Sequence, residues 1–124
     1  MITVSISKEL VQKVPLITLS CIQSQVITEA INSNLWEQII RKIKDIAGTL
    51  EIEHISRLPA IRSSRQAYKA CGKDPARYRL SAEALLRRVV KQKDIYQINN
   101  IVDLLNFVSI STGYSIGGYD AEKI

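Results

Sequence analysis

Hydrophobic and polar residues alternate in two short segments near the N-terminus. Residues 2–7 place Ile2, Val4 and Ile6 between polar neighbours, and residues 16–22 show the same two-residue period. This period is typical of β-strands, because successive side chains of a strand point to opposite faces. The pattern therefore predicts two short strands, whereas the apolar residues of segment 24–31 fit a strand or a helix equally well.

From residue 35 onward the hydrophobic period lengthens to that of an amphipathic α-helix. The apolar side chains of this segment share one side of a helical wheel: Leu35, Trp36, Ile39, Ile40, Ile43, Ile46 and Ala47. Ser33 or Asn34 is suited to cap the start, and Gly48 is suited to end the helix, because glycine adopts a left-handed backbone without strain. We expect this helix to cover a sheet.

Two further amphipathic helices are predicted downstream. Pro59 fits the first turn of one of them and Gly72 fits its end. Ser81 is the predicted cap of the other, because hydrophobic residues then recur at 82, 85, 86 and 89. Between the two, residues 73–80 form a proline-containing loop.

A last helix, residues 100–112, carries hydrophobic residues nearly all round, so we expect it to be buried. Asp103 and Asn106 then lie in apolar surroundings and need hydrogen-bond partners. Two interpretations stay open for this pair. Either the side chains cap a neighbouring loop, or they bind a substrate directly.

Together these patterns predict one α+β domain spanning residues 1–124, in which short N-terminal strands pack against several amphipathic helices. Lys8, Glu9 and Lys13 interrupt the first twenty residues, which argues against a signal peptide or a membrane span and favours a cytoplasmic protein. Cys21 and Cys71 are far apart and are expected to be buried, reduced thiols. With a single histidine, His54, neither a metal site nor a cofactor is expected.

Positive charge is concentrated in residues 57–93, which hold eleven of the seventeen Lys and Arg residues and only two acids, Asp74 and Glu83. This segment carries a net charge of +9, whereas the whole chain carries +5. Such a segment either faces a polyanion, most commonly RNA or DNA, or is a solvated surface without a partner. Helical spacing places Arg62, Arg65 and Lys69 on one ridge, and allows Glu83 to pair with Arg87.

Three segments in the second half resemble a known family. They are RQAYKACGKDPARYRLSAEALLRRVV, INNIVDLLNFVSI and TGYSIGGYD, in that order. Together they resemble the central tRNA-editing domain of the phenylalanyl-tRNA synthetase beta subunit and its free-standing relatives. The matching positions are Ile98, Asn99, Asn100, Val102, Asp103 and Asn106, followed by Gly113 and Asp120.

The resemblance implies an α+β domain beside the acceptor end of tRNA, which in bacterial synthetases hydrolyses tyrosine wrongly attached to the phenylalanine tRNA. It implies a substrate pocket with Asn106 bound to substrate or water, Asp103 as its support, and the Gly117 and Gly118 backbone facing the oxyanion. The adjacent glycines also fit a plain turn. The cations expected to position RNA phosphates are Arg62, Arg65, Lys69, Arg77, Arg87 and Arg88.

Three departures from the family pattern bear on catalysis. Gly117 stands where the family has a histidine, Leu105 where it has a threonine, and Tyr96 where it has an arginine. No complete catalytic set is visible, so an aminoacyl-tRNA deacylase and a non-catalytic RNA-binding module both stay open. In the second, Tyr68 or Tyr78 stacks on an unpaired base, unless these rings pack in the core. A third alternative is a small-molecule or protein-interaction domain that kept the fold.

The family domain continues beyond the Gly-Tyr-Asp segment into a β-rich half. Two expectations follow for this chain. Either it is the first part of a longer domain, or it completes its pocket by association, for example as a homo-oligomer.

Overall fold

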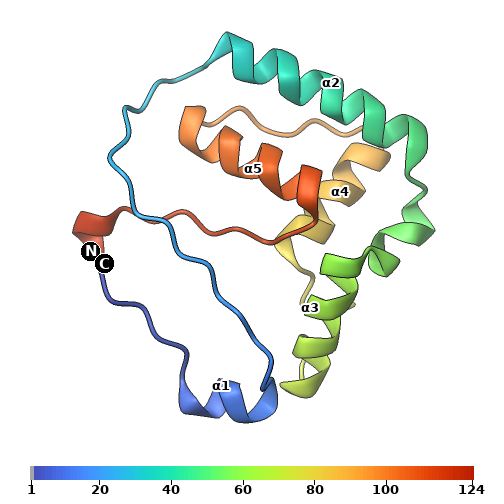
Figure 1. Cartoon of the computed structure of the whole chain (residues 1–124). Helices are drawn as coiled ribbons and strands as arrows, with labels where there is room; N and C mark the ends of the chain where they lie inside the picture. The colour runs from blue at the N-terminus through green and yellow to red at the C-terminus, as the bar shows by residue number, and fades with distance from the viewer. Residues whose placement is uncertain (1) are drawn as a thin grey trace.

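The computed structural model describes residues 2–124 and consists of helices joined by extended segments (Figure 1). The α-helices are α1 (Lys8–Lys13), α2 (Ser33–Thr49), α3 (Pro59–Ala70), α4 (Ser81–Val90) and α5 (Asn100–Thr112), with 3-10 helices η1 (Ile52–Arg57) and η2 (Ala121–Lys123). No helix in the described part of the chain is long and apolar enough to cross a membrane.

The predicted α+β class is wrong, because no β-strand forms between residues 2 and 124. Residues 2–7 and 16–22 are extended, and in Figure 1 they belong to an arc that runs beside the helices. The backbone N–H of Ile2 donates to the side chain of Gln23 at 2.8 Å, so the two segments meet without a ladder of backbone hydrogen bonds. A strand requires such a ladder with a neighbour, and an alternating pattern alone does not supply one.

The arc buries little of its apolar surface. Leu16 is 93% exposed and Ile22 is 94% exposed. Cys21 is also exposed, so the expectation of a buried thiol is wrong for this residue, whereas Cys71 is half-buried. The arc is held to the helices through Asn100, whose side chain donates to the Ile27 carbonyl at 2.9 Å.

Helix α2 confirms the amphipathic pattern, but its ends differ from the prediction. The cap is Asn32, whose side-chain oxygen accepts from the Leu35 N–H at 3.0 Å. Asn32 has the extended backbone that a cap requires, while Ser33 is already helical. Gly48 lies inside the helix, which ends one residue later at Thr49.

Helices α3 and α4 form where the pattern predicts them. Pro59 is the first residue of α3, and Gly72 follows its end with a φ of 76°, a conformation that favours glycine. Helix α4 begins at Ser81, but the Ser81 side chain caps nothing. Instead, the N–H of Ala82 donates to the hydroxyl of Ser115 at 3.3 Å, a partner distant in sequence.

The core lies where α2, α4, α5 and η1 meet, with α3 packed against η1. Its buried apolar side chains are Ile46, Ile55, Ile61, Leu80, Leu86, Val89, Ile95 and Ile110. Helix α5 has the predicted bounds, but the expectation that it is buried nearly all round is wrong. Leu104 and Val108 remain exposed, at 46% and 38%.

Candidate nucleic-acid interface

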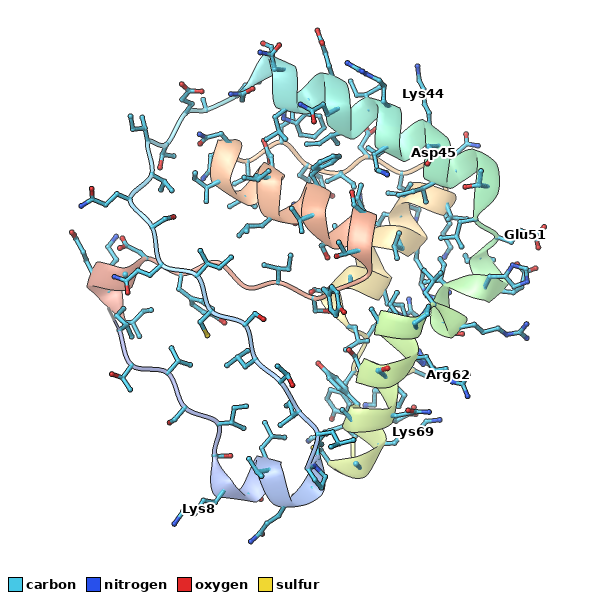
Figure 2. The ribbon with its side chains drawn as sticks, viewed as in Figure 1. Lys8, Lys44, Asp45, Glu51, Arg62 and Lys69 are labelled. Carbon is cyan, nitrogen blue, oxygen red and sulfur yellow. The ribbon has the colours of Figure 1, made fainter. Side chains whose placement is uncertain are left out.

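Helix α3 presents two exposed cations on its outer face. Arg62 and Lys69 are seven residues apart, two helical turns, and therefore lie on one side of the helix. Figure 2 shows both side chains directed away from the body of the protein, on the side of α3 that faces away from the N-terminal arc. Neither forms an ion pair with any residue of the described chain, so both charges are available to an external anion.

Arg65, the third member of the predicted ridge, is engaged inside the protein. Its Nη1 donates to both carboxylate oxygens of Glu83, at 2.8 and 3.0 Å. Arg87 donates to the same carboxylate at 3.1 Å, which confirms the predicted Glu83–Arg87 pair, and the Glu83 side chain is fully buried. This Arg65–Glu83–Arg87 cluster joins α3 to α4, and the two arginine side chains are only 22% and 24% exposed.

Arg88 also has an internal partner. Its Nε and Nη2 donate to the carbonyl of Asp94 at 3.0 and 2.6 Å, and its guanidinium lies 5.0 Å from the centre of the Tyr96 ring. These contacts fix the turn that follows α4. Of the six cations expected to bind RNA, Arg65, Arg87 and Arg88 therefore hold the fold together, and Arg62, Lys69 and Arg77 remain exposed.

The exposed basic surface also includes residues that were not singled out from the sequence. Every cation of segment 57–93 outside the three internal contacts is exposed, namely Arg57, Arg62, Lys69, Lys73, Arg77, Arg79, Lys91 and Lys93. Lys73, Arg77 and Arg79 come from the loop between α3 and α4. Their position in a proline-containing loop could have indicated that they are exposed, because loop side chains share no helix face and the loop has only one acid, Asp74.

Asp103 is buried and both of its carboxylate oxygens are occupied. Oδ2 accepts from the indole Nε1–H of Trp36 at 2.9 Å, and Oδ1 accepts from the backbone N–H of Ile98 at 3.0 Å. The side chain thus caps the loop that leads into α5 and ties this loop to α2, as the capping interpretation expects. A substrate role for Asp103 and Asn106 stays a prediction. Asn106 lies nearly one turn further along α5, and Asp103 makes no hydrogen bond to it.

The backbone at Gly117 and Gly118 lies close to side chains of other residues. A Cβ on Gly118 would lie 2.7 Å from Cδ1 of Leu105, and one on Gly117 would lie 3.0 Å from the Tyr119 ring. Neither glycine has a positive φ. Gly118 therefore allows a close approach to Leu105 of α5, and Gly117 leaves room for the Tyr119 ring.

Two surface hollows among residues 2–124 are lined by residues other than those expected to form a substrate pocket. One, of about 270 Å³, lies between α2 and α5 and is lined by Gln38, Arg41, Lys42, Asp45 and Phe107. The other, of about 310 Å³, lies within the arc and is lined by Ile2, Val4, Ile6, Leu19 and Cys21. Among residues 2–124, no three His, Cys, Asp or Glu side chains gather closely enough to hold a metal ion.

Comparison with known proteins bears on the second half of the chain. A family model described as the B3/4 domain matches residues 63–124. The match begins in α3 and contains the loop between α3 and α4, helices α4 and α5, and the Gly117–Gly118 segment. No curated protein and no solved structure compared with the chain matches it.

Proposed function

Because the chain belongs to the B3/4 domain family, the family of the phenylalanyl-tRNA synthetase beta-subunit domain, we propose that it is an RNA-binding protein whose partner is tRNA. The observation that carries this proposal is the exposed basic surface of α3 and the loop after it. Asp74 is the only exposed acid of the described segment 57–93, because Glu83 is buried between two arginines. A surface of this kind attracts a polyanion and neutralises its phosphates.

Of the six cations that the sequence predicts to bind RNA phosphates, we propose that Arg62, Lys69 and Arg77 do so. Their side chains are exposed and make no ion pair within residues 2–124. Binding an anion at these positions breaks no internal ion pair. Binding one at Arg65 or Arg87 would compete with the buried Glu83 carboxylate, which is costly because a buried charge then loses its partner.

We favour binding over catalysis by these residues alone. Hydrolysis of an RNA ester needs a general base within reach of a water molecule and donors for the developing oxyanion. The Asp103 carboxylate is occupied by Trp36 and Ile98, and Gly117 supplies no side chain where the family has a histidine. Release of tyrosine from mischarged tRNA, lost in Asn106→Ala, would establish the catalytic alternative instead.

The test compares two variants that each lose two exposed positive charges. Arg62→Ala/Lys69→Ala removes both from the proposed interface, whereas Lys8→Ala/Lys44→Ala removes them from α1 and α2, as the labels in Figure 2 show. Binding of unfractionated tRNA is measured by fluorescence anisotropy over a series of salt concentrations. We expect the affinity of the native chain to fall steeply with salt, because binding phosphates releases counterions.

The two variants should differ in their salt dependence. For Arg62→Ala/Lys69→Ala, the slope of log Kobs against log salt should become shallower by roughly two, one for each lost phosphate contact. For Lys8→Ala/Lys44→Ala, the slope should stay close to that of the native chain. Equal losses in both variants, or no tRNA binding at low salt, would contradict the proposal and favour a small-molecule or protein-interaction domain.

A further inference from the structure

Tyr78 is an exposed aromatic side chain on an ordered loop. The ring is 46% exposed, while Pro75 and Leu80 on either side of it in sequence are buried and anchor the loop. The Asp74 carbonyl accepts from the backbone N–H groups of Arg77 and Tyr78 at 3.0 and 2.9 Å. The loop therefore holds the ring at the surface instead of folding it into the core, where Tyr68 packs.

Two cations lie over this ring. Nζ of Lys73 is 5.0 Å from the ring centre and the guanidinium of Arg77 is 5.7 Å from it. Both side chains are exposed and make no ion pair within residues 2–124. They are held only by weak attraction to the ring face, and can turn toward phosphate groups when a nucleic acid arrives.

An aromatic face beside exposed cations is a combination by which proteins bind unpaired nucleotides, because the ring stacks on a base while the cations bind the flanking phosphates. We propose that Tyr78 stacks on an unpaired base, and that the RNA bound by this protein is recognised through a single-stranded segment. This inference rests on the proposed function, because it names the part of the RNA that the basic surface contacts.

The base has to be unpaired for a geometric reason. In an RNA duplex both faces of each internal base are covered by its neighbours, and only base edges and the sugar-phosphate backbone are accessible. Lys73, Arg77 and Arg79 alone would bind duplex and single-stranded RNA by charge. The Tyr78 ring is what would make the protein bind single-stranded RNA more tightly than duplex RNA.

The experiment compares two labelled RNAs. One is a blunt hairpin whose two strands are joined by a non-nucleotide linker, so that it has no unpaired base, and the other is the same hairpin with a short unpaired 3′ extension. Anisotropy titrations use the full chain and the variants Tyr78→Ala, Tyr78→Phe and Tyr114→Ala. Tyr114 is a matched control because it is another exposed tyrosine, outside the basic segment. Thermal unfolding followed by circular dichroism checks that each variant is folded, which an exposed ring should permit.

The native chain should bind the extended hairpin roughly 5- to 150-fold more tightly than the blunt one, the range expected for stacking one base. Tyr78→Ala should lose this preference while keeping its affinity for the blunt hairpin. Tyr78→Phe, which keeps the ring, and Tyr114→Ala should retain the preference.

Three results would overturn the inference in distinguishable ways. Equal binding of both hairpins by the native chain, or a preference that survives in Tyr78→Ala, would refute stacking and leave RNA binding intact. No binding of either hairpin at low salt would refute the proposed function as well. Displacement of the extended hairpin by equimolar poly-glutamate would assign the surface to an acidic polypeptide.

Discussion

Asp103 shows how one buried side chain fixes a whole region of this protein. Its carboxylate accepts from the Trp36 indole on α2 and from the Ile98 N–H in the loop before α5. Asn99, the residue after Ile98, caps α5, because its side-chain oxygen accepts from the N–H groups of Ile101 and Val102. The loop is therefore fixed from two sides, which gives the polar residues at these positions a structural role.

Asp103→Ala should strongly destabilise the protein, because it leaves the buried indole N–H of Trp36 and the part-buried N–H of Ile98 without an acceptor. Each unsatisfied donor costs about 1–3 kcal/mol, so the free energy of unfolding should fall by about 2–6 kcal/mol. Urea denaturation monitored by Trp36 fluorescence measures this loss. Asn106→Ala on the same helix is the control and should cost much less, because Asp103 gives Asn106 no hydrogen bond. Similar losses in both variants would contradict the interpretation.

At the scale of elements, α3 and α4 are joined by an ion cluster as well as by apolar packing. Glu83 is fully buried and lies between Arg65 of α3 and Arg87 of α4. Nε of Arg87 is buried and has no hydrogen-bond partner. The cluster contains two positive charges and one negative charge. Glu83 is therefore the one carboxylate that pairs with both arginines.

Glu83→Ala should lower the free energy of unfolding by about 3–5 kcal/mol, because breaking a buried ion pair leaves uncompensated charge. The control is Glu37→Ala, which removes a solvent-exposed pair with Arg41 at 3.8 Å and should cost less than about 1 kcal/mol. Replacing all three cluster residues by apolar ones, as in Arg65→Met/Glu83→Leu/Arg87→Met, should recover much of the loss. A Glu83→Ala variant as stable as Glu37→Ala would show that the cluster contributes nothing.

The whole molecule divides into a packed helical unit and a loosely attached arc. None of residues 2–31 is buried, whereas α2, α4, α5 and η1 share one core. The attachment runs mainly through Asn100, which exchanges hydrogen bonds with Ile27 and Glu29. Exposed apolar side chains along the arc fit the expectation that this surface is covered by association, which stays a prediction.

A chain that lacks residues 2–31 should therefore remain folded. The free energy of unfolding should fall by no more than about 2 kcal/mol, because water replaces the few exposed hydrogen bonds that are lost. Circular dichroism and urea denaturation measure helix content and cooperativity. The comparison is a chain lacking residues 2–50, which also loses Trp36, Ile39 and Ile46 and should not fold. Loss of cooperative unfolding in the shorter deletion would show that the arc belongs to the core unit.

Several elements were predictable because their causes are local. Helix α5 runs from Asn100 to Thr112 as predicted, since Asn99 caps its start and Gly113 ends it with a φ of 80°. Pro59 and Gly72 bound α3 for similar reasons. The Ser81 cap was wrong because Ser81 is already the first residue of the helix and Leu80 is at the cap position. The N–H of Ala82 in this first turn donates to Ser115, a residue 33 positions away. No local signal identifies such a partner.

The sequence by itself determined the α-helices α2 to α5, the concentration of positive charge and the family. Capping, hydrophobic period and motif order are properties of neighbouring residues. Only the tertiary structure decided which charges face solvent, by placing Glu83 between Arg65 and Arg87 and leaving Arg62 and Lys69 exposed. It also decided that the alternating segments 2–7 and 16–22 are not strands. Both outcomes depend on contacts between residues far apart in the chain, and a strand or an ion pair exists only where its partner lies within hydrogen-bonding distance.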